Sequence, residues 1–340
     1  MIKRIAIVLL QLFVTAAGIF YVFHDAQKRA QIGHALQTAD WRWLAIGWVV
    51  YGVVELLATM RWQLLLRVQG IKLGWLRAGV IVVIGLFFNM VLPGLVGGDA
   101  ARLLLVFKTA PRQKTRATLS VAMDRLLGLF SLLVLAALVV ALRLDWLRQF
   151  PDTAKVTYVA LALLAGVSFF MLLLLGVIGS RRRRKLSRRV PFRKQIVETG
   201  NALHLYRAHL ITVAIAFALT IFSHVGYYLS YFCAMRSLAA PGVHMASVTD
   251  VVSIMPLVNT ITGVPVSFGG VGVRETLFQT LFGKLADVPP ALAALSASLG
   301  YLIQASWGVV GGLAYLLMFR PAKEKTGRKQ SIGTGQRREK

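Results

Sequence analysis

The sequence has a single cysteine, Cys233, which excludes an intramolecular disulfide and any multi-cysteine metal site. Acidic residues are scarce, with 13 Asp and Glu against 39 Lys and Arg. The sequence also lacks a glycine-rich nucleotide loop, a metal-ligand cluster and a nucleophile constellation. We therefore expect no cofactor, no bound metal and no ATP-driven pumping by this chain alone.

Charged side chains make up only 15% of the 340 residues, whereas hydrophobic side chains make up 57%. Apolar runs of roughly 20 residues recur along the chain, and each could cross about 30 Å of hydrocarbon as a helix. The formal net charge of +26 lies between these runs. Charge in that position orients the loops of a membrane protein, so we expect no nucleic-acid partner. The composition predicts an all-α polytopic membrane protein.

Six apolar runs are uninterrupted, and we predict that they form full transmembrane helices. They cover residues 5–23, 43–66, 118–142, 155–178, 210–235 and 291–318. The first run follows Lys3 and Arg4, as the core of a signal peptide would. It is longer than such a core and no cleavage site follows it, so we interpret it as a retained anchor helix.

Two further apolar regions, 78–107 and 251–283, are interrupted by proline and glycine. Each arm has about 14 residues and would rise roughly 21 Å, which is too short to cross the hydrocarbon core. Lys and Arg concentrate in cytoplasmic connectors, and they place both flanks of 78–107 on the cytoplasmic side. The same reasoning places both flanks of 251–283 on the outer side. We therefore predict two re-entrant helical hairpins that enter the membrane from opposite faces.

The order of two spans, a hairpin and a span occurs twice with opposite orientation, which defines an inverted-topology repeat. The first repeat covers residues 1–150 and the second covers 151–319. Residues 320–340 form a basic tail that we expect to be disordered. We expect both termini on the cytoplasmic side of a bacterial inner (plasma) membrane.

The two interruptions match one another in sequence, which supports the predicted repeat. The first reads NMVLPGLVGGDAAR, from Asn89 to Arg102, and the second reads NTITGVPVSFGGVGVRE, from Asn259 to Glu275. Each contains proline, three residues, Gly-Gly, three residues and arginine. The matched positions are Pro93, Gly97, Gly98 and Arg102 in the first break and Pro265, Gly269, Gly270 and Arg274 in the second.

These motifs, together with Arg61–Trp62 and the segment DRLLG at Asp124–Gly128, resemble the flippase-like transmembrane family. This family is also called the lysylphosphatidylglycerol synthase transmembrane region. The resemblance covers most of the chain, from residue 5 to residue 318. It implies a lipid-handling helix bundle, and some relatives are proposed to move charged or glycosylated lipids across the bilayer. In the synthase a separate soluble domain performs aminoacyl transfer, and we expect no such domain here.

Arg102 and Arg274 are the candidates for contact with an anionic headgroup. A guanidinium in a low-dielectric site is costly unless it is paired, and its planar set of donors matches phosphate. Glycines beside it let backbone N–H groups approach an anion, and the amino terminus of a following helix adds to the attraction. The structural alternative is that each arginine only pairs with a carboxylate or caps the broken backbone, and Asp99 and Glu275 are the carboxylates nearest in sequence to Arg102 and Arg274. The predicted headgroup-binding residues are Arg102, Arg274, Asn89, Gly97, Gly98, Asn259, Gly269 and Gly270, with Pro93 and Pro265 as hinges.

A second set of residues is predicted to form ion pairs or to couple transport to an energy source. Glu55 lies near the middle of its span, where a carboxylate needs a partner or a proton. Asp124 and Arg125 lie early in their span, where they could gate a cavity, carry protons or hold the neighbouring hairpin. The whole set is Glu55, Asp99, Asp124, Arg125 and Glu275.

The preferred function is translocation of an anionic lipid, either a phospholipid or a polyprenyl-phosphate-linked glycan, with its headgroup at the two hairpin tips. One alternative is an intramembrane enzyme that acts on a lipid phosphate, with Asp99, Asp124 or Glu275 as its base. Another is a non-transporting partner of a lipid-synthesis complex. Inverted duplication favours transport over an enzyme, because alternating access uses two equivalent halves. The expected partners are an anionic membrane lipid and enzymes of lipid or glycan synthesis, and the oligomeric state is left open.

Overall fold

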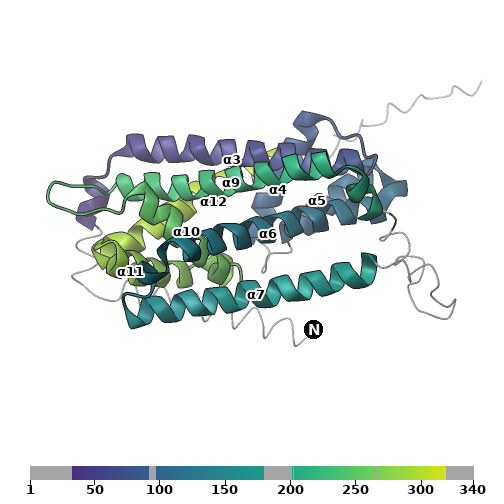
Figure 1. Ribbon diagram of the computed structural model, residues 1–340. Coiled ribbons are helices and arrows are strands. Elements are labelled where there is room, and N and C mark those ends of the chain that lie inside the picture. Colours follow the sequence, from purple (N-terminus) through teal and green to yellow (C-terminus); the bar gives the residue numbers. More distant parts are fainter. Residues whose placement is uncertain (1–32, 92–96, 180–200, 202, 265–266, 319–340) are drawn as a thin grey trace, which may run out of the picture.

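The computed structural model describes residues 33–91, 97–179, 201, 203–264 and 267–318, and this part of the chain is helical, with no β-strand (Figure 1). The long helices are α3 (Trp41–Val68), α6 (Lys114–Leu147), α7 (Pro151–Gly179), α9 (Leu210–Arg236) and α12 (Pro290–Met318). The short helices are α4 (Trp75–Val91), α5 (Gly97–Thr109), α10 (Val248–Thr262) and α11 (Val273–Leu285). Two 3-10 turns, Pro111–Gln113 and Phe268–Gly270, precede α6 and α11.

The five long helices coincide with five of the predicted transmembrane spans. Each has the length and apolar character that are needed to cross a membrane. The remaining predicted span, 5–23, and the tail 320–340 lie outside the described residues, so the predicted total of six spans stays a prediction. The described part of the chain is therefore an α-helical membrane bundle.

The two interrupted regions form two pairs of short helices, α4 with α5 and α10 with α11. They have 17, 13, 15 and 13 residues in chain order. At about 1.5 Å per residue none of the four exceeds about 26 Å, which is less than the hydrocarbon thickness. The hinge prolines Pro93 and Pro265 lie outside the described residues. Helix pairs thus occur where the sequence predicts hairpins, although entry into a bilayer from one face stays a prediction.

Contacts between connectors show which helix ends lie together. The Asp40 amide donates to the Ser237 carbonyl, Arg143 pairs with Asp250, and Lys284 pairs with Asp152, so these connectors share one end of the bundle. At the opposite end the Arg116 side chain donates to the Gln69 carbonyl. Helices α10 and α11 lie at the first end, and α4 and α5 lie toward the second (Figure 1). Each pair therefore starts and finishes at a single end, as a re-entrant hairpin requires.

Local sequence signals determine where several helices begin. The carboxylate of Asp40 accepts from the Arg42 amide before α3, and Ser247 forms a capping box with Asp250 before α10. Pro151 and Pro290 occupy the first positions of α7 and α12, where a missing N–H costs nothing. These residues therefore determine where α3, α7, α10 and α12 begin.

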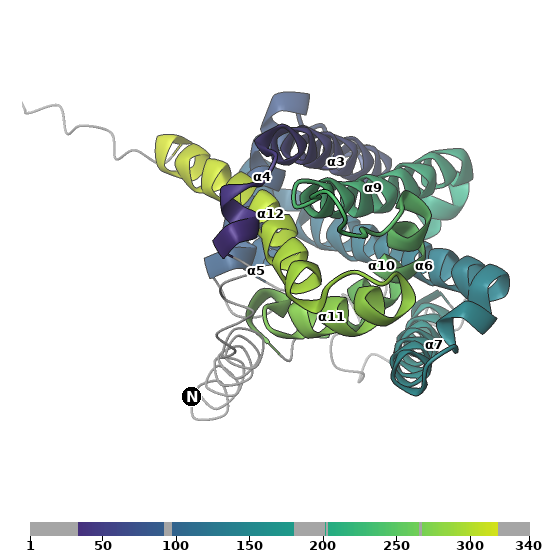
Figure 2. The ribbon, with the colours of Figure 1, turned by 90° about the vertical axis from the view of Figure 1, so that its left-hand side faces the viewer.

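Glycines allow several helices to pack closely, among them α3 and α9, which lie side by side in Figure 2. Helix α3 packs along α9, and α12 packs along α4. A Cβ atom at Gly311 of α12 would overlap the backbone of Val83 on α4, and one at Gly52 of α3 would meet the ring of Trp307. Close approach through small residues is the usual basis of helix association in membranes. These contacts hold α3, α4, α9 and α12 as one packed unit around the two breaks.

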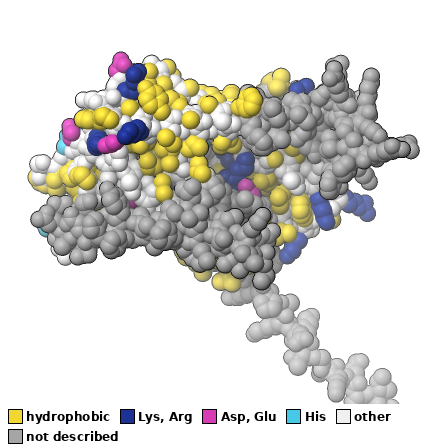
Figure 3. Space-filling model, turned by 90° about the horizontal axis from the view of Figure 1, so that it is seen from below, with side chains coloured by type: hydrophobic (Ala, Val, Ile, Leu, Met, Phe, Trp, Pro, Cys, Tyr) yellow, Lys and Arg dark blue, Asp and Glu magenta, His cyan; other side chains and the backbone are white. Residues whose placement is uncertain are grey.

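Large apolar side chains are exposed on the outward faces of the long helices. Examples are Val49, Val53 and Leu56 on α3 and Leu313 and Leu317 on α12. On the face seen in Figure 3, apolar side chains cover much of the described surface between charged groups. In water such a surface would promote association, whereas lipid chains solvate it.

Cysteine labelling tests the predicted sides of the membrane. Arg112 and Gln149 are exposed and lie just beyond the two ends of α6. In a Cys233→Ala background, a cysteine at 149 should react with an impermeant maleimide in intact cells. A cysteine at 112 should react only after permeabilisation. Equal labelling of both sites in intact cells would show that the assignment of sides is wrong.

Candidate functional site

The first break is closed by direct contact between α4 and α5. The side-chain oxygen of Asn89 accepts from the Gly98 amide at 2.8 Å, which caps the first turn of α5. A Cβ atom at Gly98 would overlap the carbonyl oxygen of Gly85 and the Asn89 side chain. Asn89 and Gly98 therefore join the two arms of this break, and Gly97 is the first residue of α5.

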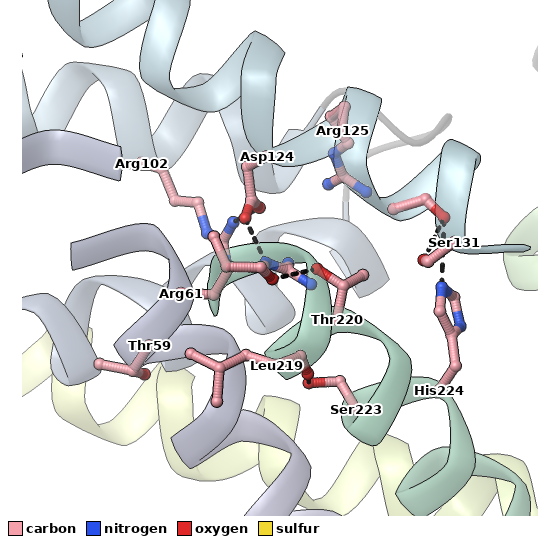
Figure 4. A network of polar contacts seen from close by, with 12 residues as sticks. Thr59, Arg61, Arg102, Asp124, Arg125, Ser131, Leu219, Thr220, Ser223 and His224 are labelled. Carbon is pink, nitrogen blue, oxygen red and sulfur yellow. Dashed lines mark hydrogen bonds and ion pairs between the residues drawn. The ribbon is translucent and has the colours of Figure 1, made fainter. Parts of the chain in front are cut away.

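Asp124 is the centre of a buried charge network at this break (Figure 4). Its carboxylate lies 2.6 Å from Nε of Arg61 and 3.4 Å from Nη1 of Arg102. The three side chains come from α3, α5 and α6, and Asp124 is only 4% exposed. The guanidinium of Arg102 also lies over the ring of Trp62, 5.3 Å from its centroid. A single carboxylate thus holds two arginines inside the bundle.

Arg102 pairs with a carboxylate, as the structural alternative states, but the partner is Asp124 and not Asp99. Asp99 instead receives two hydrogen bonds from Arg125, from Nε at 2.7 Å and from Nη2 at 2.8 Å. This bidentate pair joins the first turn of α5 to α6 and is partly exposed, since 46% of the Arg125 side chain is accessible. The ion pair of Asp99 with Arg125 therefore connects the first break to α6. Arg102 forms its ion pair with Asp124.

Glu55 lies on α3 beside this network. It is buried, with 8% exposure, and Arg102 and Arg61 are close enough to act on its charge. The hydroxyl of Tyr51, one helical turn earlier, also interacts with its carboxylate. Glu55 is thus a carboxylate with cationic neighbours at the middle of a long apolar helix. The structure places it within the network of the first break.

The second break carries Arg274, which is buried, with 6% exposure, in a different environment. Its Nη2 donates to the Gly269 carbonyl at 3.1 Å, and its guanidinium lies over the rings of Tyr301 and Tyr231, at 5.1 and 5.9 Å. Its Nε and Nη1 have no hydrogen-bond partner among the described residues. The hydroxyl of Ser267, in the same break, also lacks a partner there.

Glu275 forms no salt bridge with Arg274, whose contact with the Gly269 carbonyl is the backbone cap that the structural alternative also includes. Its Oε2 accepts from the Gly272 amide at 2.6 Å, and its Oε1 accepts from the Ser298 hydroxyl at 3.1 Å. Glu275 thereby caps the amino terminus of α11 and joins it to α12. Both oxygen atoms of the Glu275 carboxylate are therefore engaged in fixing the position of α11.

The two breaks differ in backbone structure although their sequences match. In the first break Gly97 and Gly98 begin α5, so Arg102 lies more than one turn inside that helix. In the second break Gly269 and Gly270 have positive φ angles of 62° and 78° and form a turn. A further glycine, Gly272, with φ of 84°, postpones the start of α11 until just before Arg274. Matched arginines therefore have different positions on their helices.

Some residues around the breaks were not among the predicted site residues. Tyr231 of α9 and Tyr301 of α12 contact Arg274, and the hydroxyl of Tyr227 donates to that of Tyr231 at 3.2 Å. The signal in the sequence is the four-residue spacing of Tyr227 and Tyr231, which places both on one helix face. Asn259, which was predicted, lies on α10 and accepts through its backbone carbonyl from the Gly263 amide.

The apolar helices and the buried arginines, carboxylates and tyrosines together define an integral membrane protein of the polytopic α-helical class. The chain belongs to the lysylphosphatidylglycerol synthase transmembrane-region family, whose family model matches residues 8–312. The match covers the transmembrane region and confirms the resemblance seen in the sequence motifs. No curated protein sequence matches the chain. Membership of this family indicates a lipid-related function in the membrane.

Proposed function

We propose that the protein translocates an anionic lipid, either a phospholipid or a polyprenyl-phosphate-linked glycan, across the membrane. The observation that carries this proposal is a buried arginine at each of the two breaks. Arg102 and Arg274 are 9% and 6% exposed, inside a bundle whose outer surface is apolar. Buried cations between membrane helices are costly, and they commonly mark a path for a charged substrate. A lipid phosphate supplies the complementary charge.

Helix contacts support the proposed inverted repeat. Exchanging α3 with α9, α4 with α10, α5 with α11 and α6 with α12 maps observed contacts onto other observed contacts. For example, α4 packs on α12 as α10 packs on α6, and α5 packs on α6 as α11 packs on α12. Two halves with corresponding contacts suit alternating access, in which one half moves against the other around a central site.

The proposal also includes the membrane in which the protein lies, its orientation and its partners. We place the protein in a bacterial inner (plasma) membrane with both termini in the cytoplasm, where basic connectors meet anionic headgroups. Its partners are the anionic lipid itself and enzymes that synthesise the lipid or its glycan. We propose no enzymatic activity for the chain.

A lipid-flipping assay tests the proposal. Purified protein in liposomes should increase the transbilayer movement of acyl-labelled fluorescent phosphatidylglycerol, which is measured by the fraction that dithionite quenches. Arg102→Ala and Arg274→Ala should each slow this movement. Because both residues serve one path, the double variant should lose clearly less than the sum of the single losses.

Two results would count against translocation. Equal movement in protein-free liposomes and in liposomes with protein would remove the proposed function for this lipid. Chemical conversion of the lipid by purified protein without movement between leaflets, measured by mass spectrometry, would favour the enzyme alternative. A chain that neither moves nor converts lipid would fit the non-transporting partner.

A further inference from the structure

We infer that the two breaks are unequal and that Arg274, in the second break, is the site where a phosphate-type anion binds. This inference rests on the proposed function and deepens it, because it assigns the headgroup to one arginine. The basis is a contrast in how the two buried guanidinium groups are satisfied.

Arg102 already has an anionic partner. It donates to Asp124 from Nη1, and none of its nitrogen atoms is buried without a hydrogen-bond partner. A ligand that reached Arg102 would compete with a carboxylate held in place by Arg61 as well. Competition with a buried ion pair reduces the net gain from an incoming anion.

Arg274 forms no salt bridge with any described residue, although the Glu275 carboxylate is close enough to act on its charge. Within the described ranges no carboxylate lies at salt-bridge distance from it, because Glu275 is engaged with the Gly272 amide and Ser298. Helix α12 packs against α11 as α6 packs against α5. However, α12 contains no Asp or Glu, so it offers no equivalent of Asp124. Among the described residues two donors of this buried guanidinium lack an acceptor, and an incoming anion would supply one.

The surroundings of Arg274 specify the chemistry of the ligand. The rings of Tyr231 and Tyr301 stabilise its positive charge but accept no hydrogen bond from Nε or Nη1, which are buried. These donors lie on different edges of the guanidinium, on either side of the Nη2 that contacts Gly269. Nη2 has two N–H groups and uses one of them for Gly269, so its other N–H forms a two-pronged edge with either Nε or Nη1, and this edge matches two oxygen atoms of one phosphate.

The tyrosine rings are held rigidly, so the site is preorganised. A Cβ atom at Gly300 of α12 would collide with the ring of Tyr231, and Tyr231 also packs on Phe278 of α11 with ring centroids 5.7 Å apart. The hydroxyl of Tyr301 lies beside Gly269, where any side chain would meet it. Preorganised donors and aromatic contacts reduce the ordering cost of binding.

Binding to the full-length protein in non-ionic detergent tests the inference, with microscale thermophoresis as the measurement. The probes are dioctanoyl phosphatidylglycerol, dioctanoylglycerol, which has the same chains without phosphate, and inorganic phosphate. The wild type should bind phosphatidylglycerol and not dioctanoylglycerol. Arg274→Gln should weaken binding by about tenfold or more, since a hydrogen bond to a charged group contributes about 1.5–3 kcal/mol. Arg102→Gln should have a clearly smaller effect.

Control variants keep the result interpretable. Arg148→Gln removes an exposed arginine at the carboxyl end of α6, outside both breaks, and should leave binding unchanged. If Arg274→Gln does not elute as a single peak, Arg274→Lys replaces it. It keeps the charge but should still bind several-fold more weakly, because lysine has no planar edge with two parallel donors.

The outcomes separate the inference from the proposed function. Equal losses in Arg102→Gln and Arg274→Gln would overturn the inequality of the breaks while leaving lipid translocation in place. No binding of either phosphate compound to the wild type would overturn both. Binding of inorganic phosphate without phosphatidylglycerol would support the anion site but would remove the lipid as its ligand.

Discussion

Asp124→Ala should prevent most of the protein from folding, because it leaves two buried arginines without their carboxylate. Removing one partner of a buried ion pair typically costs about 3–5 kcal/mol, and here both Arg61 and Arg102 lose their partner. That loss is comparable to the whole stability of many domains. We expect little monodisperse protein after detergent extraction, as measured by fluorescence-detected size-exclusion chromatography.

Asp152→Ala is the matched control, because Asp152 also pairs with a cation but is 53% exposed. Exposed pairs contribute at most about 1 kcal/mol, so its elution profile should resemble the wild type. A second variant, Asp124→Ala with Arg61→Met, removes one of the two orphaned cations and should recover part of the monodisperse peak. Identical profiles for Asp124→Ala and Asp152→Ala would show that the network contributes little to folding.

The helices and their interruptions could be predicted from the sequence because hydrophobic length and loop charge act locally. The apolar run 43–66 is long enough to cross the membrane as a helix. Helix α3 extends only two residues beyond this run at each end. Pro-Gly interruptions similarly marked the two pairs of short helices. The positive-inside rule also predicted which connectors lie together, since both flanks of each pair fall at one end of the bundle.

The partners of the charged residues could not be predicted, because they depend on packing between helices far apart in sequence. Asp99 stands three residues from Arg102, yet it pairs with Arg125, 26 residues away. Spacing along one helix gives neighbours on that helix, whereas Arg102 faces α6 and finds Asp124 there. The sequence identified most members of the network without their pairing, but Arg61, which pairs with Asp124, was not among the predicted site residues.

The matched motifs also gave no sign that the two breaks differ in backbone structure. Both contain Gly-Gly four residues before arginine, but the residues between differ. Asp99-Ala100-Ala101 favours helix and lets α5 begin at Gly97, whereas Gly272 keeps the second break in a turn. The local preference for helix therefore decides how far each arginine lies from its helix start.

Gly98→Ala should destabilise the first break strongly, because the glycine is required for packing between α4 and α5. The added methyl group would overlap the backbone oxygen of Gly85 and lie 2.6 Å from the Asn89 side-chain oxygen. Overpacking of this kind typically costs about 1–3 kcal/mol, and backbone atoms cannot move aside as a flexible side chain can. It should also break the capping bond from the Gly98 amide to Asn89.

Gly128→Ala provides the comparison for Gly98→Ala, since a Cβ atom at Gly128 of α6 meets nothing within 4 Å. There alanine should be neutral or stabilise by about 0.5–1 kcal/mol through its higher helix preference. The thermal midpoint of the detergent-solubilised protein should fall for Gly98→Ala and stay or rise for Gly128→Ala. Asn89→Ala should lower it by a smaller amount, because it removes only the cap. If Gly98→Ala is as stable as the wild type but loses phosphatidylglycerol binding, the glycine serves the anion, and the first break is a binding site after all.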